Sequence, residues 1–286
     1  MGKSYFIVGG DARQCAMRDL LCAQGQEVAS FGLERDDRLD AKRIARLAQA
    51  EIVLLPLPAA DEHGNLRAPY MNNAVPMELV WPLLHREQIV FGGMLSERLL
   101  KDAAKYDIAP VDYQLDEAFV LHNAHITAEC AVHLTVQKLQ DVLRGKRCLV
   151  LGYGRIGKFL ARLLACSGCA VTVAVRRREV LTQAELDGYK TCDLRMLPAA
   201  TTDADIIYNT IPHLVADRAV LGAIPKTCFC MDLASQPGGF DYGAAEEMGI
   251  QVLRAKGLPG AMAPKAAGKA ILRVVERIMA EKEGKI

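Results

Sequence analysis

Three glycines, Gly152, Gly154 and Gly157, have the spacing that points most directly to chemistry in this chain. They lie between a short apolar stretch typical of a buried strand and a stretch typical of a helix. Gly152 would allow a tight turn, Gly154 the approach of a pyrophosphate, and Gly157 close packing of helix on strand. The pyrophosphate would accept hydrogen bonds at the helix N-terminus, where the dipole favours anions. The alternative is a glycine turn that binds nothing. The other residues assigned to this dinucleotide-binding segment are Tyr153, Arg155 and Ile156.

The end of the next strand bears on which dinucleotide would bind. NAD enzymes usually place Asp or Glu about 20 residues past the glycines, where it accepts hydrogen bonds from the ribose 2′-OH. Arg176 and Arg177 stand there instead, and the first carboxylate is Glu179. A guanidinium fork suits a phosphate. The sequence therefore predicts NADP as the cofactor and makes NAD the weaker candidate; the alternative is a solvated basic turn.

Length and composition bound the class of protein. The chain has 286 residues, is 51% hydrophobic and carries a net charge of +1. These values predict two domains with sizeable cores and give no global reason to expect nucleic acid or an anionic membrane as partner. No apolar run reaches the ~18 residues of a membrane span, and the N-terminus runs into a strand without a signal peptide. Nine cysteines, an odd number, favour a reduced cytoplasm over a disulfide framework.

The cysteines and histidines do not have the spacing of a metal site. Cys166 and Cys169 form a CxxC, but it falls where a helix should end, and Gly168 suits the helix C-terminus. Cys228 and Cys230 alternate along an apparent strand and are expected to be buried as small hydrophobes. We predict no metal. The histidines without trusted metal spacing are His63, His85, His122, His133 and His213.

Two α/β arrays follow one another, and their alternation predicts a doubly wound, Rossmann-like parallel sheet in each. A helix over residues 121–143, with an apolar stripe at helical spacing, separates them. The expected organisation is a first domain on the substrate side over 1–120, a connecting helix over 121–144, an NAD(P)-binding domain over 145–258, and a C-terminal segment over 259–286 whose helix packs back on the first domain or the connecting helix.

The expected elements of the first array are strands at 5–10, 27–31, 51–56, 88–92 and near 111, with helices at 13–23, 78–86 and 96–105. The second array has expected strands at 148–152, 170–175, 205–211, 227–234 and 251–254. Its helices are expected after the glycines, near 182–186, near 217–222 and near 241–248, with a long one over 262–282. Gly64, Asn65 and Pro69 mark a loop at the C-terminal end of a first-domain strand, where open α/β sheets bind ligands.

Four further motifs lie at 9–14, 209–212, 232–239 and 257–265. Together with the glycine segment they resemble, in order and spacing over nearly the whole chain, the dipicolinate synthase A-subunit family of spore-forming bacteria. The second half is more distantly similar to alanine dehydrogenase and nicotinamide nucleotide transhydrogenase. The resemblance implies oxidation of dihydrodipicolinate to pyridine-2,6-dicarboxylate, with hydride transfer to NADP. It also implies a second, flavoprotein-like B-subunit, a hetero-oligomer, and the mother cell of a sporulating bacterium.

The predicted binding residues follow from strand ends and from this resemblance. Contact with the nicotinamide ribose is expected from 209–212, whose alternative is a proline-terminated strand without ligand contact. Asp11 and Arg13 occupy a strand-to-helix turn, where Arg13 would clamp a carboxylate; the alternative is helix capping by Asp11. Lys265 lies near a helix start, where the dipole disfavours a cation, which points to an anionic ligand; the alternative is a solvated lysine. The cofactor residues of this group are Asn209, Thr210, Ile211, Pro212, Ser235 and Pro259. The substrate residues are Asp11, Arg13, Gln14, Gly239 and Lys265.

The catalytic base is expected near the start of the connecting helix. Histidine side chains titrate near neutrality and burial raises the pKa of a carboxyl group, so His125 and a partly buried Glu129 are the candidates. The alternative for Glu129 is a local role at the second position of a helix capped by Thr127. Gln236 departs from the alanine dehydrogenase pattern, which has a catalytic aspartate there, and an amide is no general base.

Two other functions remain open from the sequence. One is an amino- or hydroxy-acid dehydrogenase on the same scaffold, against which Gln236 argues. The other is a cofactor-binding scaffold whose partner performs the chemistry.

Overall fold

The computed structural model describes residues 2–35, 37–282 and 284. The chain forms two compact units, one of residues 1–123 with 259–286 and the other of residues 124–258. The division falls inside a single helix, α4 (Glu117–Leu139). The sequence predicted that helix over 121–143, so it begins earlier and ends sooner than expected. Asp116 explains the start, because its carboxylate accepts a hydrogen bond from the Phe119 N–H and so caps the first turn.

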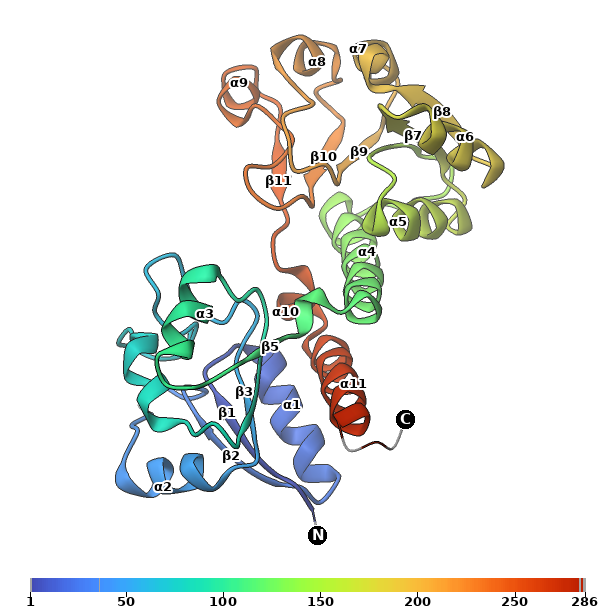
Figure 1. Cartoon of the computed structure of the whole chain (residues 1–286). Helices are drawn as coiled ribbons and strands as arrows, with labels where there is room; N and C mark the ends of the chain where they lie inside the picture. The colour runs from blue at the N-terminus through green and yellow to red at the C-terminus, as the bar shows by residue number, and fades with distance from the viewer. Residues whose placement is uncertain (1, 36, 283, 285–286) are drawn as a thin grey trace. The chain divides into compact units, whose positions relative to one another are not determined.

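The first unit is built on a parallel five-stranded sheet in the order β2-β1-β3-β4-β5 (Figure 1). Its strands are β1 (Ser4–Val8), β2 (Glu27–Phe31), β3 (Ile52–Leu54), β4 (Ile89–Gly92) and β5 (Val111–Asp112). Its helices are α1 (Ala12–Ala23), α2 (Ala41–Gln49), α3 (Glu97–Ala104), α10 (Leu258–Met262), which begins at the unit boundary, and α11 (Pro264–Lys282). Short 3-10 turns lie at Met77–Leu79, Trp81–Leu83 and Tyr113–Leu115.

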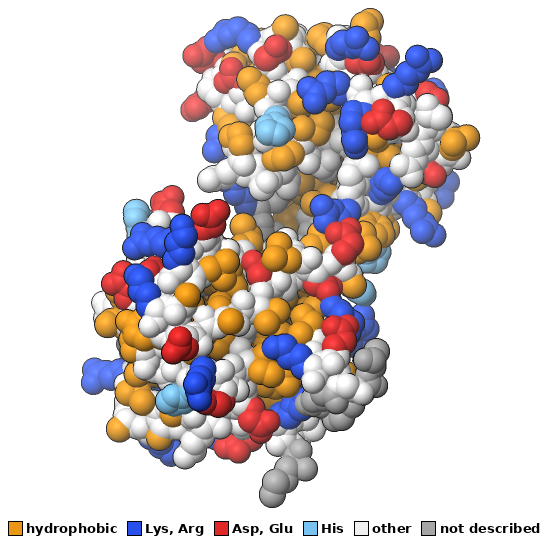
Figure 2. All heavy atoms as spheres, in the orientation of Figure 1, with side chains coloured by type: hydrophobic (Ala, Val, Ile, Leu, Met, Phe, Trp, Pro, Cys, Tyr) orange, Lys and Arg blue, Asp and Glu red, His pale blue; other side chains and the backbone are white. Residues whose placement is uncertain are grey.

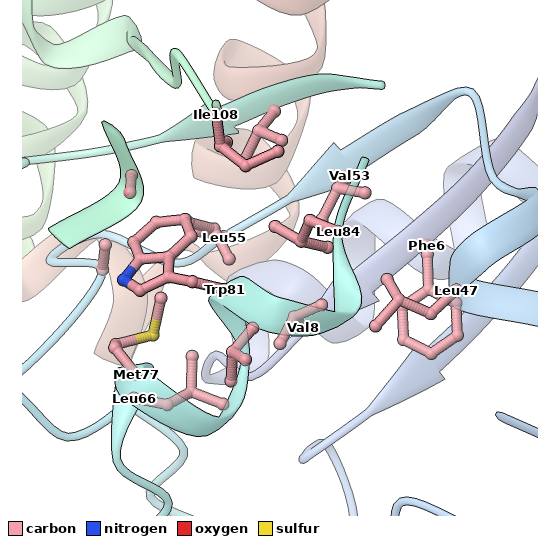
Figure 3. Close-up of a cluster of buried hydrophobic side chains, with 14 of the residues drawn as sticks. Phe6, Val8, Leu47, Val53, Leu55, Leu66, Met77, Trp81, Leu84 and Ile108 are labelled. Atoms are coloured by element: carbon pink, nitrogen blue, oxygen red, sulfur yellow. The ribbon is translucent and has the colours of Figure 1, made fainter. Parts of the chain in front are cut away.

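One hydrophobic core of this unit lies on the face of the sheet that carries Phe6 and Val53, while the alternating residues Ile7, Ile52 and Leu54 are buried on the other face. Trp81 is fully buried in this core, and Figure 3 shows its indole close to Met77 and Leu55. The helix expected over 78–86 is absent, and two 3-10 turns stand in its place. Pro82 gives the reason, because a proline in a helix interior lacks the N–H and clashes with the preceding turn. Helix α2 was not predicted from the sequence, because Leu47 is its only buried residue.

The C-terminal helix α11 packs against α1 in this unit, as the sequence predicted. Gly268 makes the close approach possible, since a Cβ there would lie 2.8 Å from the Arg13 carbonyl oxygen. Arg277 also forms an ion pair with Asp116. Throughout the described part of the chain, no helix has both the length and the apolar character needed to cross a membrane.

The second unit has a parallel six-stranded sheet in the order β11-β10-β9-β6-β7-β8. Counted within the unit, this is 6-5-4-1-2-3, the strand order of the dinucleotide-binding fold. Its strands are β6 (Arg147–Leu151), β7 (Ala170–Val175), β8 (Lys190–Asp193), β9 (Ile206–Asn209), β10 (Phe229–Asp232) and β11 (Val252–Arg254). Its helices besides α4 are α5 (Arg155–Cys166), α6 (Arg178–Leu186), α7 (Leu197–Thr201), α8 (Arg218–Ala223) and α9 (Tyr242–Glu247), with a 3-10 turn at Leu194–Met196.

The sequence missed β8 and α7 in this unit. β8 is a four-residue edge strand, Lys-Thr-Cys-Asp, without a fully buried side chain, so it lacks the apolar run that marks a central strand. Cys228 and Cys230 are buried in the hydrophobic core, as expected. On the face drawn in Figure 2, acidic and basic side chains are mixed over each unit.

Candidate functional site

The glycine segment forms a turn from β6 into α5, as its spacing predicts. Gly152 has φ +98°, which favours glycine, and a Cβ on it would lie 2.4 Å from the Thr210 Oγ1. A Cβ on Gly157 would lie 2.2 Å from the Gly152 carbonyl oxygen, so α5 can pack this closely on the turn only with glycine there. Gly154 is different, because a Cβ on it would meet nothing within 4 Å. The open space in front of Gly154 is where a pyrophosphate would lie.

Helix α5 begins without a side-chain cap. Gly154 is its N-cap residue and, having no side chain, provides no side-chain cap. The starts of α1, α8 and α9 are instead capped by Asp11, Asp217 and Asp241. An uncapped helix start beside open space can accept an anion, because the N–H groups and the dipole both favour negative charge.

The side chains of Tyr153 and Thr210 form hydrogen bonds with residues around this turn. The Tyr153 hydroxyl donates to the Asp187 Oδ2 at 2.7 Å. Burial and this carboxylate raise the pKa of Tyr153 above its usual value, so the hydroxyl stays protonated at neutral pH. The Thr210 Oγ1 donates to the Leu151 carbonyl oxygen at 2.9 Å. Both side chains are therefore committed to protein contacts, which leaves their backbone as the part that could meet a cofactor.

The arginines after β7 stand at the C-terminal edge of the sheet. Arg176 is exposed and has no ion-pair partner among the residues described. The Arg177 Nε lies 3.6 Å from the Glu179 Oε1, and both side chains are largely exposed. At the end of the neighbouring strand β8, Asp193 binds Arg195 of the following 3-10 turn, and the hydrogen bonds from Arg195 lower the pKa of that carboxyl to about 2. Arg176 is thus a cation at this edge that is open to a phosphate.

At the ends of β9 and β10 two polar side chains meet in the interior. The Asn209 Nδ2 donates to the Asp232 Oδ1 and to the Ile211 carbonyl oxygen, each at 2.9 Å. Asn209 also accepts from the Ile211 N–H at 3.1 Å. Its hydrogen-bonding groups are used within the protein, so its side chain orders the strand end rather than facing a ligand. Pro212, after it, is exposed.

Asp232 is 2% exposed and organises the loop after β10. Besides Asn209, its oxygens accept from the Ala234 N–H at 3.0 Å, the Gly239 N–H at 2.8 Å and the Tyr242 hydroxyl at 2.6 Å. Gly239 has to be glycine, because a Cβ would lie 2.2 Å from the Asn209 Nδ2. Gly239 is thus buried under the strand end, whereas Ser235 in the same loop is exposed.

His125 and Glu129 lie one turn apart in α4. The His125 Nε2 is 3.8 Å from the Glu129 Oε1, and the side chains are 46% and 57% exposed. The His125 ring packs edge-on against Phe159 of α5, with centroids 5.0 Å apart. Two expectations are corrected here. Glu129 is more exposed than expected, and Thr127 does not cap a helix, since it lies well inside α4.

In the first unit, Asp11 caps α1 in a capping box with Gln14, as the capping alternative predicted. The Arg13 fork binds the same Asp11 carboxylate at 2.9 and 2.8 Å and also reaches the Leu57 carbonyl oxygen. Burial opposes ionisation of Asp11, but Arg13 outweighs it and lowers the pKa of Asp11. Arg13 is therefore held by its own carboxylate, and its proposed substrate contact would require exchanging that partner.

The remaining predicted residues differ in exposure. Lys265 is exposed in the first turn of α11 and has no ion-pair partner within the described ranges, whereas Pro259 is buried in α10. The Gln14 side chain is buried, and its Nε2 has no hydrogen-bond partner among the residues that the structure describes. The described residues include no group of three His, Cys, Asp or Glu side chains placed to hold a metal ion.

Sequence reasoning missed the pair of Tyr242 and Arg254. The Arg254 guanidinium lies over the Tyr242 ring, with Cζ 3.3 Å from the centroid. The two residues come from α9 and β11 and are 12 positions apart, so no local pattern links them. The available signal was an arginine at the end of a strand on the ligand-binding edge of the sheet.

Two family models match the chain. Residues 4–114 match the N-terminal domain of the dipicolinate synthase A-subunit. Residues 123–224 match the NAD-binding domain of D-isomer specific 2-hydroxyacid dehydrogenases, and this range contains the turn from β6 into α5. Each model covers mainly one of the two units.

Relatives match over the full length. The dipicolinate synthase A-subunit of Bacillus subtilis (strain 168) is 29% identical, with 99% of both sequences covered. The crystal structure of the dipicolinate synthase A-subunit from Bacillus halodurans has a TM-score of 0.85 at 29% identity, with 98% of both chains covered. The transhydrogenase of Sinorhizobium meliloti has a TM-score of 0.67 at 14% identity, covering 98% of this chain and 95% of that one, and shares the fold.

Proposed function

Because the chain belongs to the dipicolinate synthase A-subunit family, we propose that it oxidises dihydrodipicolinate to pyridine-2,6-dicarboxylate with NADP as the hydride acceptor. The reaction removes a hydride from one ring carbon and a proton from a neighbouring position, which leaves an aromatic ring. The protein must hold two rings face to face, bind two carboxylates and accept one proton.

The observation that carries this proposal is the open start of α5. Gly154 faces free space and as N-cap residue has no side chain to cap the helix, and Gly152 and Gly157 fit only as glycine. These residues fit a bound dinucleotide, which supplies a nicotinamide ring as hydride acceptor. The backbone at 152–157 would hold the pyrophosphate, with the side chains of Tyr153 and Thr210 fixing the turn.

The choice of NADP over NAD rests on Arg176. No carboxylate follows β7 before Glu179, which Arg177 already approaches. A carboxylate at the end of β7 would accept hydrogen bonds from a ribose 2′-OH and repel a 2′-phosphate, whereas an unpaired guanidinium attracts the phosphate. We assign the 2′-phosphate to Arg176, with Arg177 as the second contact.

The redox end of the cofactor would lie by the loops after β9 and β10. A buried hydrogen bond from Asn209 to Asp232 joins the two strand ends, so the exposed residues that follow extend from a fixed backbone. We assign contact with the nicotinamide ribose to the backbone of Ile211 and to Pro212 and Ser235. A rigid support of this kind keeps a ring in position for hydride transfer.

We assign the proton acceptor to His125. Its Nε2 faces the Glu129 carboxylate at 3.8 Å, and its ring is held by Phe159. The carboxylate would stabilise the imidazolium that forms when His125 takes the proton. Glu129 acts in this scheme through His125 and is not itself the base.

A variant series tests this assignment. His125→Asn should lower kcat by 10²-fold or more, since positioned general bases contribute about 10²–10⁴-fold. Glu129→Gln should lower kcat less, because it removes the carboxylate that stabilises the imidazolium but leaves the base in place. His122→Asn, a second histidine of the same helix, is the matched control and should retain activity. Near-normal turnover by both His125→Asn and Glu129→Gln would assign the base elsewhere or to water.

The family name implies a partner, and we propose a flavoprotein-like B-subunit that joins this chain in a hetero-oligomer. The purified chain, the purified partner and their mixture should be assayed separately for NADP-dependent turnover of dihydrodipicolinate. Turnover by this chain alone, raised when the partner is added, is expected. If only the partner turns over the substrate, this chain is a cofactor-binding scaffold. If the chain instead oxidises amino or hydroxy acids, it is a dehydrogenase of that class.

A further inference from the structure

We propose that Arg254 binds one of the two carboxylates of the substrate and thereby makes the site selective for a dicarboxylate; this inference rests on the proposed function. Arg254 is the last residue of β11 and pairs in register with Asp232 of β10. It therefore lies at the C-terminal edge of the second sheet, the edge at which open α/β sheets bind ligands.

The strand order places Arg254 on the redox side of this edge. The sheet runs β11-β10-β9-β6-β7-β8, and the glycine turn follows β6 at its centre. Arg176, after β7, lies on one side of that turn, and Arg254 lies on the other. If Arg176 takes the adenosine end of the cofactor, the nicotinamide ring extends over β9 and β10, and a substrate stacked on it comes next to β11.

The Arg254 side chain is held before any ligand arrives. Its Cζ lies 3.3 Å from the centre of the Tyr242 ring. The Tyr242 hydroxyl in turn donates to the buried Asp232 carboxylate at 2.6 Å. Burial and this hydrogen bond raise the pKa of Tyr242 to about 12, so the donor keeps its proton at neutral pH. A guanidinium stacked by its face on a fixed ring leaves its N–H edges free.

Those edges have no carboxylate partner in the protein. Arg254 is exposed and forms no ion pair with any residue in the described ranges. Three other arginines of the unit bind carboxylates of their own: Arg147 binds Asp205, Arg195 binds Asp193, and Arg218 binds Glu247. An oriented and unpaired fork suits the bidentate binding of a planar carboxylate.

Lys256 provides the matched control. It is exposed, two residues from Arg254, and likewise has no ion-pair partner in the described chain. It differs in that no aromatic ring in the described chain orients it. Lys256→Gln and Arg254→Leu each remove one positive charge from the same segment, so comparing them separates a specific fork from general electrostatic attraction.

The test is calorimetric titration of the full-length chain, saturated with NADP, in metal-free buffer. The two probes are pyridine-2,6-dicarboxylate and the monocarboxylate pyridine-2-carboxylate. The wild type should prefer the dicarboxylate. Arg254→Leu should weaken dicarboxylate binding by about 10- to 100-fold, the range for a lost charge-assisted pair, and remove most of the preference. Lys256→Gln should change either affinity by less than about threefold.

Variants of the supporting ring refine the test. Tyr242→Phe keeps the platform for Arg254 and should retain the preference, whereas Tyr242→Leu removes the platform and should reduce it. Arg254→Lys keeps the charge without the fork and should lie between the wild type and Arg254→Leu. The NADP affinity and thermal unfolding of Arg254→Leu should match the wild type, which shows that the variant folds.

Three results would overturn the inference. Unchanged dicarboxylate binding by Arg254→Leu would show that Arg254 does not contact the ligand. Equal weakening by Lys256→Gln and Arg254→Leu would show a general charge effect. If the wild type binds neither probe, the proposed function is wrong, and the assignment of Arg254 falls with it. Failure of the proposed function thus appears in the wild type, whereas failure of the Arg254 assignment alone appears only in the variants.

Discussion

At the residue scale, the candidate site depends on which polar side chains already have partners. Asp232 accepts hydrogen bonds from Asn209, Tyr242 and two backbone N–H groups, and it is buried. Arg176 and Arg254, at the same edge of the sheet, have no carboxylate partner in the described chain. Buried polar groups need partners for folding, so the unpaired and exposed charges are the ones available for a ligand.

Charge reversal at Arg176 should change cofactor choice. Arg176→Asp is expected to weaken NADP binding by about 10- to 100-fold, because a carboxylate repels the 2′-phosphate and the fork is lost. NAD affinity should stay the same or improve, since the new carboxylate can accept from the 2′-OH. Calorimetric titration with both cofactors measures the change. Arg162→Asp, on the outside of α5, controls for net charge, and equal NADP affinity in both variants would refute the assignment.

The Asp11–Arg13 pair should make stability depend on pH. Arg13 lowers the folded-state pKa of Asp11 below the ordinary 3.8, so the unfolded state binds the proton more readily. The stabilisation is therefore present above about pH 4 and is lost as the pH falls below it. Asp11→Asn should lower the melting temperature clearly at pH 7 and much less at pH 3. Asp19→Asn, an exposed carboxylate of α1, should show no such difference, and a constant effect of Asp11→Asn would exclude this linkage.

At the scale of elements, the turn from β6 into α5 contains one glycine that is needed for packing and another that is available for binding. Gly157 packs against the Gly152 carbonyl, whereas Gly154 faces open space at the start of the helix. The two glycines therefore serve different purposes, packing at Gly157 and ligand access at Gly154, and substitutions at them should have different consequences.

Gly157→Ala should destabilise the protein, because its Cβ would overlap the Gly152 carbonyl oxygen; overpacking of this kind costs about 1–3 kcal/mol. Gly154→Ser should leave stability unchanged or raise it by up to ~1 kcal/mol, because serine is a favourable N-cap. The same serine would occupy the space and N–H groups that the pyrophosphate needs, so NADP affinity should fall at least about tenfold. Denaturant unfolding and calorimetry measure the two effects, and retained NADP binding by Gly154→Ser would place the pyrophosphate elsewhere.

At the scale of the whole molecule, the chain has two units with separate hydrophobic cores that share one helix, α4. Only the second unit contains the glycine turn. A ligand that binds one native unit raises the stability of that unit by mass action. Cofactor binding and core substitutions should therefore act on separable unfolding transitions.

Scanning calorimetry should resolve two transitions, of which NADP raises only one. Trp81→Ala, in the first core, should lower the transition that NADP leaves unchanged, since loss of a buried large aromatic costs about 3–5 kcal/mol. Ile207→Ala, in the second core, is the matched variant and should lower the NADP-sensitive transition. A single transition affected alike by both substitutions and by NADP would mean that the units unfold together.

The sequence by itself determined the two parallel α/β arrays, the position of the glycine turn and the absence of a carboxylate after β7. These features depend on local patterns: apolar runs, helix caps and glycine spacing. The edge strand β8 and the helix α2 were not predicted, because they bury few side chains and so leave a weak pattern in the sequence.

The tertiary structure alone decided which side chains are free to act. Arg13 binds Asp11 and Leu57, 44 residues away, and Asn209 binds Asp232 across two strands. The stacking of Arg254 on Tyr242 likewise joins β11 to α9. Such partnerships arise where strands and helices distant in sequence come together, so residue type and spacing can nominate a binding residue, but only packing decides whether its charge is still available.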